Sequence, residues 1–384
     1  MTFKRCITLL LIITLMVTLA VENVQAKSDL GSSNLKPDCT SAILMEAKTG
    51  QILFEQNADE ALPPASVTKI MTLLITMEAI ESGALAFDDM LTCSSNAASM
   101  GGSQVYLEEG EQMSVDELIK CVVICSANDA AVMLAEGVAG SEAAFVDKMN
   151  RRAAELGMNN TVFENTNGLD DTAQNHVTSA RDIAIMSREL IGHKKILEYS
   201  SIWMDSIRNG SFGLTNTNRL VRFYPGATGL KTGSTSKAKF CISATAERNG
   251  MHLVCVIMGA ETRDIRNAAA TQLLDWGFAN YSLYVDSASE CEAVPVKGGT
   301  NNFVNSNTKE FCCLVPKGSE SKIVRQITLD DFVTAPVAAG DVVGRVKYIC
   351  NDQTIGEADV LASETVGKIE FKHVFVRIFL TFMF

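Results

Sequence analysis

The sequence predicts an α+β fold, in which an antiparallel sheet carries an inserted helical subdomain and is followed by a small all-β domain. Two short strands, Ser41–Glu46 and Gln51–Gln56, flank a three-residue turn near the start of the chain. Two longer strands, Lys239–Glu247 and Met251–Gly259, are joined by an Asn-Gly turn much later. These hairpin signals are separated by a long stretch of helical period, so we expect the first and last strands to share one sheet.

Helical segments fill the interval between the two hairpins. An apolar helical period begins near Ser66, and Ser114 with Glu117 forms a capping box that opens a helix running through Ile124. Further helices are expected from Ser141 to Gly157, from Thr178 or Ser179 through Leu190, and over about 264–281. The helical subdomain is therefore an insertion between the first and last strands.

The helical period disappears after residue 283. Short runs such as 311–315, 322–328 and 342–350 alternate there with Gly and with Asp or Asn turns, a pattern typical of β-structure. We therefore expect a mixed α+β domain over residues 38–283 and a β-rich domain over residues 284–365.

The first 26 residues have the organisation of a signal peptide. Two basic residues precede a nearly continuous apolar run from Cys6 to Ala20, and Val24-Gln25-Ala26 offers a small-residue cleavage site. The alternative is an uncleaved membrane anchor, although the apolar run is shorter than the roughly 20 residues that a spanning helix needs. We expect residues 1–26 to direct export and the polar segment 27–37 to be a linker.

Residues 366–384 carry an amphipathic pattern. Apolar side chains recur at i, i+3 and i+4 from Phe371 to Phe382, and basic residues lie off that stripe. The apolar run is too short to span a bilayer and is interrupted by Arg377. One interpretation is an anchor on the membrane surface, which would place the exported protein at the outer face of the cytoplasmic membrane or in the wall. The other is a last element packed on the protein's own core.

The charge balance argues against nucleic acid as a partner. The 384 residues include 33 Lys and Arg against 45 Asp and Glu, for a net charge of −12, which leaves no surplus of cations for a polyanion. With 47% hydrophobic residues and only 7 Pro, the composition also excludes disordered and collagen-like chains.

The eleven cysteines would ordinarily indicate disulfides in an exported protein. However, Cys121 and Cys125 lie one helical turn apart in an apolar run, and Cys241 and Cys255 fall in apolar strand-like sequence. The adjacent cysteines at 312–313 would face opposite sides of a strand, and there is no CxxC pair. We therefore expect mostly free thiols, no metal site and no cofactor.

Three short motifs carry the chemistry: Ser66-Val67-Thr68-Lys69, Ser126-Ala127-Asn128 and Lys231-Thr232-Gly233, in this order. Each pattern is weak alone, because SxxK occurs six times, SxN three times and KTG twice in the chain. Their contexts distinguish these copies. Only this SxxK begins a strongly apolar helix, only this SxN interrupts an apolar helical stretch, and only this KTG opens strand-like sequence.

The residue types at these positions fit acyl transfer by a Ser-Lys pair. A serine hydroxyl becomes nucleophilic when a base takes its proton, and a Lys base must be neutral, which burial and neighbouring positive charge favour. Ser66 is our candidate nucleophile and Lys69 its base. Ser126 can relay the proton to the leaving amine, and Asn128 can hold Lys69 or the substrate amide.

Substrate binding is assigned to the strand that the KTG motif opens. Lys231 and Thr232 offer a positive charge and a hydroxyl to a substrate carboxylate, and Gly233 has no side chain to block it. The backbone N–H of Ser234, together with that of Ser66, can form the oxyanion hole.

At these residues the sequence resembles the low-molecular-weight penicillin-binding proteins, the serine-type D-alanyl-D-alanine carboxypeptidases. The resemblance extends from Ser41 to about Val366 and is most specific at 64–72, 125–131 and 228–233. It implies a penicillin-binding or β-lactamase-like catalytic domain followed by the small β-domain and the anchor. It also implies an acyl-enzyme on Ser66, with Lys69 as proton acceptor and Lys231 binding substrate.

The activity that the resemblance implies is removal of the terminal D-Ala from peptidoglycan stem pentapeptides, with β-lactam antibiotics as inhibitors. Ser234 and Lys239 depart from the pattern that we expect for the family, which bears on substrate preference rather than on the catalytic groups. Two alternatives stay open at this point. One is a β-lactamase, with Glu164 as its general base, and the other is a non-catalytic penicillin sensor or wall-binding module on the same fold.

Overall fold

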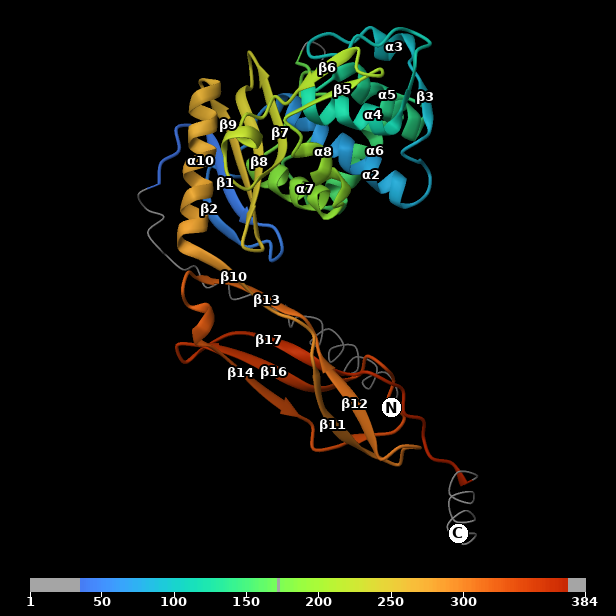
Figure 1. Cartoon of the computed structure of the whole chain (residues 1–384), viewed down its shortest axis with the longest axis vertical. Coiled ribbons are helices and arrows are strands. Elements are labelled where there is room, and N and C mark those ends of the chain that lie inside the picture. Colours follow the sequence, from blue (N-terminus) through green and yellow to red (C-terminus); the bar gives the residue numbers. More distant parts are fainter. Residues whose placement is uncertain (1–34, 171–172, 372–384) are drawn as a thin grey trace, which may run out of the picture. The chain divides into compact units, whose positions relative to one another are not determined.

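The computed structural model describes residues 35–170 and 173–371. Within these residues an antiparallel sheet has the strand order β2-β1-β9-β8-β7, so the first and last strands do share one sheet, as predicted (Figure 1). The strands are β1 (Ser41–Glu46), β2 (Ile52–Gln56), β7 (Ala227–Thr235), β8 (Lys239–Arg248) and β9 (Met251–Ala260). The predicted signal peptide and most of the predicted linker lie outside the described residues.

Strand β1 is buried along its whole length because it lies between β2 and β9 in the sheet and helices pack against both of its faces. Its run of apolar residues, Ala42-Ile43-Leu44-Met45, matches this position, since a central strand covered on both faces has no need of polar alternation. At its end, the buried carboxylate of Glu46 accepts from the backbone N–H groups of Lys48 and Thr49. The first Lys-Thr-Gly copy in the sequence is therefore a hairpin turn.

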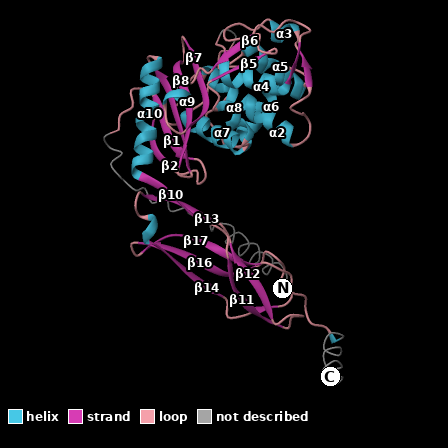
Figure 2. Ribbon diagram, in the orientation of Figure 1, coloured by secondary structure: helices cyan, strands magenta, loops and turns pink. Residues whose placement is uncertain are grey.

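Helices cover both faces of the sheet. Helix α10 (Arg263–Asn280) packs against β8 and β9 on one face, and α7 (Ala180–Gly192) packs against β1 and β9 on the other (Figures 1 and 2). The remaining helical elements before β7 are the 3-10 helix η2 (Ala65–Thr68), α2 (Lys69–Glu81), α3 (Ser95–Ala98), α4 (Val115–Lys120), a π-helical turn (Cys121–Cys125), α5 (Asn128–Ala139), α6 (Glu142–Glu155), α8 (Lys195–Ser200) and α9 (Leu220–Phe223). Short hairpins β3 (Met90–Thr92) with β4 (Gln112–Ser114), and β5 (Met204–Ile207) with β6 (Phe212–Thr215), complete this part.

Side-chain caps fix several helix starts where the sequence predicts them. The hydroxyls of Ser114, Ser141 and Ser179 accept from the backbone N–H three residues on, at α4, α6 and α7. Ser179 rather than Thr178 is thus the cap of α7. Each cap satisfies an N–H group that the helix itself cannot bond.

Two predicted helices differ from expectation in their detail. The helix that begins near Ser66 opens with a 3-10 turn, and its α-helical part begins at Lys69. The helix from Ser114 through Ile124 is α-helical only to Lys120 and ends in the π-helical turn. Both irregular turns lie at the chemical motifs, where the chain must change direction to present a side chain.

The main core lies between the sheet and the helices. Phe145, on α6, is fully buried among apolar side chains of this cluster. Cys121, Cys241 and Cys255 are also fully buried, as their apolar sequence predicts. Each of the ten cysteines in the described part of the chain is a free thiol.

Between Tyr281 and Ala362 the structure is all β, apart from one 3-10 turn (Glu320–Lys322). Six strands of the described residues form a sheet in the order β14-β16-β17-β12-β11-β15, and β10 pairs with β13. Their bounds are β10 (Tyr281–Asp286), β11 (Glu290–Lys297), β12 (Phe303–Thr308), β13 (Phe311–Pro316), β14 (Ile323–Leu329), β15 (Val333–Thr334), β16 (Val342–Cys350) and β17 (Gln353–Ala362).

A separate apolar cluster supports this β-domain. Tyr348 is its largest fully buried side chain; the ring of Phe311 stacks on it at 3.9 Å between centroids, and its hydroxyl donates to Asp286 at 2.6 Å. Val366 pairs with Val337, and Lys368 pairs with Gly299, so the first residues of the predicted anchor segment contact the β-domain. The rest of that segment, from residue 372, lies outside the described residues.

We expect Phe145→Ala to lower the free energy of unfolding of the α+β part by about 3–5 kcal/mol, because it removes a fully buried ring and leaves a cavity. Phe223→Ala is the matched control, since that ring is 69% exposed; its cost should stay below about 1 kcal/mol. Urea unfolding followed by tryptophan fluorescence measures both. Equal losses of unfolding free energy in the two variants would contradict the assignment of Phe145 to the core and of Phe223 to the surface.

Candidate active site

Ser66 and Lys69 meet in the first turn of the helix that follows β2. The Nζ of Lys69 donates to Ser66 Oγ at 2.9 Å and to the backbone carbonyl oxygen of Asn167 at 2.8 Å. Ala65, just before the serine, has a φ of +48°, which is an uncommon conformation for a residue with a side chain. Such strain is typical of functional sites, where the surrounding packing holds the backbone in place.

Burial controls the charge of this pair. Lys69 is fully buried, and desolvation, reinforced by the nearby Lys231 ammonium, holds the pKa of Lys69 well below its usual range. A lysine in this environment can be neutral near physiological pH and can take a proton from the serine at hydrogen-bond distance.

The KTG strand lies directly beside the serine. A Cβ added to Gly233 would come within 2.8 Å of the Pro64 carbonyl oxygen and 2.9 Å of the Ser66 backbone nitrogen. The sequence assigns this glycine to substrate access. The structure adds a different reason for it, because any side chain here would push β7 away from Ser66. Ser234, the next residue of β7, is exposed.

Lys231 and Thr232 lie in the buried middle of this strand. The Nζ of Lys231 donates to the Thr232 carbonyl oxygen at 2.9 Å, and the Thr232 hydroxyl donates to Thr217 Oγ1 at 2.8 Å. Burial lowers the pKa of Lys231 to about 7, and the Arg266 guanidinium adds to that effect. Lys231 is thus poised between its two charge states near neutral pH.

The SxN motif sits in the turn between the π-helical turn and α5. Ser126 adopts a left-handed conformation, with a φ of +67°, and its buried Oγ has no hydrogen-bond partner within the described residues. Thr217 joins this turn to the KTG strand, because its backbone N–H donates to the Ile124 carbonyl oxygen at 3.0 Å and its hydroxyl accepts from Thr232 at 2.8 Å. The three motifs therefore converge on one place.

Asn128 does not hold Lys69. Its Nδ2 donates to the Gly101 carbonyl oxygen at 2.7 Å, whereas Lys69 is held by the Asn167 backbone. The Oδ1 of Asn128 is buried and lacks a partner within the described part of the chain. The structure therefore shows no hydrogen bond between Asn128 and Lys69, and the Asn128 oxygen is left as a buried acceptor.

A second layer that the motifs do not predict supports Ser66 from behind. The backbone N–H of Glu164 donates to His176 Nδ1 at 3.0 Å, and His176 Nε2 lies 2.7 Å from Thr68 Oγ1. The Thr68 hydroxyl donates to the Ala65 carbonyl oxygen at 2.8 Å, so Nε2 carries the hydrogen and donates to Thr68. Burial lowers the pKa of His176 to about 4, which keeps the ring neutral and this chain of hydrogen bonds intact.

Gly168 completes this support. Its φ is +82°, and a Cβ there would come within 1.9 Å of the Ala65 carbonyl oxygen and 2.8 Å of Thr68 Oγ1. The loop around it is fixed by Asn165, whose Oδ1 accepts from the Gly168 backbone nitrogen at 2.7 Å. The neighbouring Asn167 carbonyl can therefore reach Lys69.

Arg266 is another charged group that sequence patterns miss. It lies on the sheet-facing side of α10, is buried, and donates to the Cys241 carbonyl oxygen at 3.4 Å. Burial and nearby arginines lower its pKa to about 10, so it stays charged at neutral pH and adds positive potential near Lys231. The only sequence signal is an arginine within an otherwise apolar helix face.

Comparison with known proteins identifies the family of the chain. The sequence pattern of the D-alanyl-D-alanine carboxypeptidase family matches residues 28–262, and that of the penicillin-binding protein 5 C-terminal domain matches residues 278–368. The chain is 39% identical over 376 residues to the D-alanyl-D-alanine carboxypeptidase DacF of Bacillus subtilis, covering 96% of each chain. The chain belongs to the D-alanyl-D-alanine carboxypeptidase family.

Other members of the carboxypeptidase family confirm the fold class. DacC of Escherichia coli is 34% identical and covers 86% of this chain and 84% of its own. Penicillin-binding protein 5 of Haemophilus influenzae superposes with a TM-score of 0.76 at 31% identity, over 87% of this chain and 99% of its own. Penicillin-binding protein D2 of Listeria monocytogenes, solved in its ampicillin-bound form, has a TM-score of 0.59 at 32% identity over 64% of this chain and 99% of its own. The protein is therefore a serine-type hydrolase with a penicillin-binding catalytic domain and a C-terminal β-domain.

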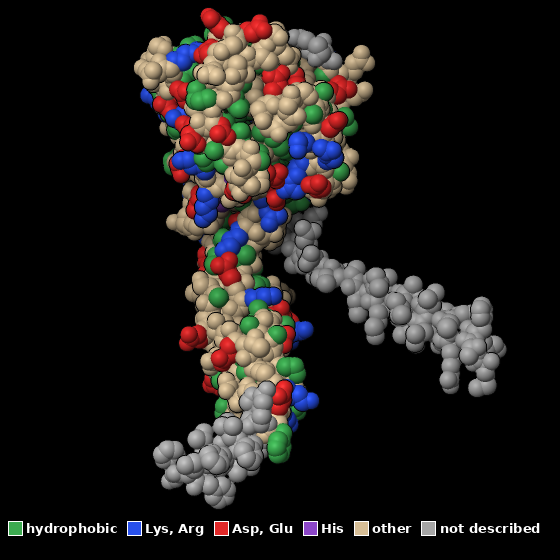
Figure 3. Space-filling view, turned by 90° about the vertical axis from the view of Figure 1, so that its right-hand side faces the viewer, with side chains coloured by type: hydrophobic (Ala, Val, Ile, Leu, Met, Phe, Trp, Pro, Cys, Tyr) green, Lys and Arg blue, Asp and Glu red, His purple; other side chains and the backbone are tan. Residues whose placement is uncertain are grey.

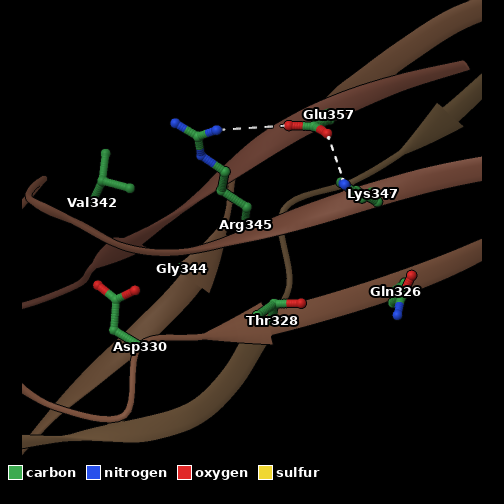
Figure 4. Close-up of a pocket in the computed structure, with 8 residues that line it drawn as sticks. All are labelled: Gln326, Thr328, Asp330, Val342, Gly344, Arg345, Lys347 and Glu357. Carbon is green, nitrogen blue, oxygen red and sulfur yellow. Dashed lines mark ion pairs between the residues drawn. The ribbon is translucent and has the colours of Figure 1, made fainter. Parts of the chain in front are cut away.

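The β-domain of this carboxypeptidase carries a cavity of about 570 Å³. It lies over β14, β16 and β17, where Arg345 and Lys347 both face Glu357, at 3.8 and 3.6 Å (Figure 4). Its cations are thus already paired, and none of the motif residues lines it. Among the described residues, no cluster of His, Cys, Asp or Glu could hold a metal ion, and no described helix is long and apolar enough to cross a membrane.

Gly168→Ala should slow acylation by a fluorescent penicillin about 100-fold, because the new Cβ displaces the Ala65 carbonyl and with it the serine. Gly210→Ala is the matched control. It has the same left-handed backbone, with a φ of +87°, but nothing within 4 Å of the added Cβ. Its acylation rate should stay within about twofold of wild type. Similar slowing in both variants would indicate backbone strain alone rather than a displaced nucleophile.

Proposed function

We propose that this protein is a D,D-carboxypeptidase that removes the terminal D-Ala from peptidoglycan stem pentapeptides through an acyl-enzyme on Ser66. The observation that carries the proposal is the 2.9 Å contact between Ser66 Oγ and the fully buried Lys69. This pair provides a nucleophile with a neutral base in contact with it, and its neighbours provide groups for each further step.

Acylation begins when neutral Lys69 takes the Ser66 hydroxyl proton and Oγ attacks the carbonyl carbon of the penultimate D-Ala. The carbonyl oxygen becomes an oxyanion, which the backbone N–H groups of Ser66 and Ser234 would stabilise. Losing one donor of this kind typically raises a barrier by about 3 kcal/mol. Because these donors belong to the backbone, the difference between Ser234 and the residue expected for the family leaves this function intact.

Ser126 serves the leaving group. Its buried hydroxyl has no partner within the described residues, so it can accept a proton from Lys69 and pass its own to the departing amine of D-Ala. Asn128 Oδ1 can accept from the substrate's backbone amide at the same time. Water then attacks the ester, with Lys69 again as base, and releases the shortened peptide.

Lys231 and Thr232 give the enzyme its preference for a chain terminus. A positive charge and a hydroxyl in the middle of β7 fit the carboxylate of the terminal D-Ala, and the buried Arg266 reinforces the positive potential. A β-lactam carries a carboxylate and a reactive amide in a similar arrangement, so we also propose that β-lactams acylate Ser66 and act as inhibitors.

The contacts of Glu164 argue against a β-lactamase, in which this residue would be the general base. Glu164 is exposed, and its carboxylate accepts from the backbone N–H groups of Gln174 and Asn175 at 2.7 and 3.0 Å. It therefore fixes a loop rather than activating water for rapid deacylation. The intact Ser-Lys pair, in turn, favours an enzyme over a pure sensor or wall-binding module.

The proposed place of action is outside the cytoplasm. We propose that residues 1–26 form a signal peptide, that 27–37 form a linker, and that the catalytic and β-domains span about 38–283 and 284–365. We further propose that the amphipathic segment within 366–384 binds the membrane surface, which would hold the enzyme at the outer face of the membrane, near its substrate.

Ser66→Ala should abolish both covalent labelling by benzylpenicillin and release of D-Ala from a diacyl-Lys-D-Ala-D-Ala peptide. Ser319→Ala is the matched control, because Ser319 is another buried serine of an SxxK sequence but lies in the β-domain. Mass spectrometry of the intact protein and of its peptides locates the adduct. An adduct that persists in Ser66→Ala, or fast penicillin hydrolysis without D-Ala release, would refute the proposal.

The pH profile tests the two lysines. Lys69 must be neutral to act as the base, and its pKa is strongly depressed. The neutral fraction of Lys69 therefore grows as pH rises. Lys231 must be charged to bind a carboxylate, and its pKa is about 7, so kcat/KM should fall as pH rises through that value. In Lys231→Arg the guanidinium stays charged, and this high-pH limb should disappear even if the maximal activity is lower. A limb that stays unchanged in Lys231→Arg would assign the high-pH limb to another group.

A further inference from the structure

The loop that leads from α3 to β4, residues 99–111, presents a tyrosine ring beside the SxN motif. The carbonyl oxygen of Ser103 in this loop accepts from the Asn128 backbone N–H at 2.7 Å. Tyr106 follows three residues later, within a reach of about 11 Å along the chain. Its side chain is 67% exposed, whereas the flanking Val105 and Leu107 are buried. The ring is therefore directed to solvent close to the proposed active site.

The backbone of Tyr106 has a conformation that is unusual for an aromatic residue. Its φ is +57°, in the left-handed region that glycine and asparagine enter more readily. The buried Asp129 carboxylate accepts from the backbone N–H groups on either side of Tyr106, at 3.0 and 3.1 Å. Arg208 donates to the carbonyl oxygen of Tyr106 at 3.3 Å and to that of the preceding residue at 2.8 Å. Backbone strain that several contacts hold in place is a feature of ligand-binding positions.

The side chains around Tyr106 also fix its ring. Phe212 of β6 lies edge-on to the tyrosine ring, with 6.4 Å between centroids, and the Arg208 guanidinium stands over the Phe212 ring at 5.5 Å. Arg208 is itself held by an ion pair with Glu111 at 2.7 Å. We call Tyr106, Phe212 and Arg208 the tyrosine platform. An exposed aromatic ring on a rigid support is suited to stacking against the flat face of a ligand.

The charges of the tyrosine platform point to an uncharged ligand. Arg208 is paired with Glu111, and the carboxylate of Asp129 is buried and bonded to the loop, so neither offers a free charge. On the face of the protein shown in Figure 3, acidic and basic side chains are interspersed. A pyranose sugar fits this chemistry, because its C–H groups can stack on the tyrosine ring while its hydroxyl and acetamido groups stay in water.

We propose that the tyrosine platform binds an N-acetylated amino sugar of the glycan strand, so that the enzyme recognises stem peptides while they are attached to glycan. This inference rests on the proposed carboxypeptidase function and names the substrate more closely. In peptidoglycan the N-terminus of the stem peptide is joined to such a sugar. When the penultimate D-Ala lies at Ser66, three residues and a lactyl group lead to the sugar over roughly 13 Å.

The position of the tyrosine platform agrees with this direction of the substrate. The terminal carboxylate is assigned to Lys231 and Thr232 on β7, whereas the loop of Tyr106 is bonded to Asn128, the proposed partner of the substrate amide. The platform therefore adjoins the side of the site from which the acyl part of the substrate extends. Binding there is remote from the bond that breaks, so it should lower KM and leave kcat nearly unchanged.

The test compares one stem pentapeptide in two forms with the full-length enzyme. One form has an acetylated N-terminus, and the other carries an N-acetylglucosaminyl-N-acetylmuramyl disaccharide there. We would measure kcat and KM for release of D-Ala from each form. Wild type should prefer the disaccharide form about tenfold in kcat/KM, chiefly through a lower KM. Tyr106→Asn removes the ring with a residue that tolerates the positive φ, and it should lose this preference. On the acetylated form it should stay within about twofold of wild type.

Tyr106→Phe keeps the stacking face and should retain the preference. Phe303→Ala is the matched control, because it removes a ring of the β-domain that is 56% exposed, and it should leave both substrates unchanged. Penicillin labelling at the wild-type rate confirms that each variant is folded, and Tyr106→Gly replaces Tyr106→Asn if the latter labels poorly.

Two results would overturn this inference while leaving the carboxypeptidase intact. One is a wild type that releases D-Ala equally well from both forms. The other is an equal loss on both forms in Tyr106→Asn, because the loop would then serve the peptide or the catalytic groups rather than the sugar. Failure of wild type to release D-Ala from either form would refute the proposed function itself.

Discussion

The use of Lys69 as a base for Ser66 depends on a single condition, which is that the lysine amine stays out of water. An exposed lysine would be protonated at neutral pH and could not act as a base. Burial is the main cause of the depressed pKa of Lys69, and the positive charge of Lys231 lowers this pKa further. The remaining hydrogen bond of the amine goes to a backbone carbonyl, that of Asn167, which can hold the amine in either protonation state without adding a countercharge.

The rest of the fold can be understood as the support for this pair. Strand β7 supplies one wall and the helical part supplies the other, and the two approach Ser66 so closely that side chains are absent at Gly233 and Gly168. Behind the serine, His176 and Thr68 tie the strained Ala65 to the loop that positions Asn167. Neutral hydrogen-bonding groups suit this position, because an added charge would alter the pKa of Lys69.

Much of the fold follows from local signals, and the site follows in part. The strand hairpins and the serine caps are encoded within a few residues, so the α+β order and several helix starts are predictable from the sequence. The context of each motif also selected one SxxK, one SxN and one KTG copy, and Ser66 and Lys69 of the selected SxxK lie at hydrogen-bond distance. The 3-10 turn at Ala65–Thr68 and the π-helical turn at Cys121–Cys125 were not predictable, because the pattern of apolar residues is compatible with a regular helix and only packing selects the irregular one.

The sequence alone therefore determined which chemical groups the protein has and the order of its elements. The tertiary structure decided what those groups can do. Asn167 contacts Lys69 through its backbone carbonyl, which every residue type possesses. Arg266 contributes a buried charge from α10, which follows all three motifs in the sequence. Neither residue leaves a recognisable pattern in the chain. The decisive property is the depressed pKa of Lys69, which comes from burial and from the charge of Lys231. Lys69 and Lys231 are far apart in the sequence, and only the folded chain brings them together.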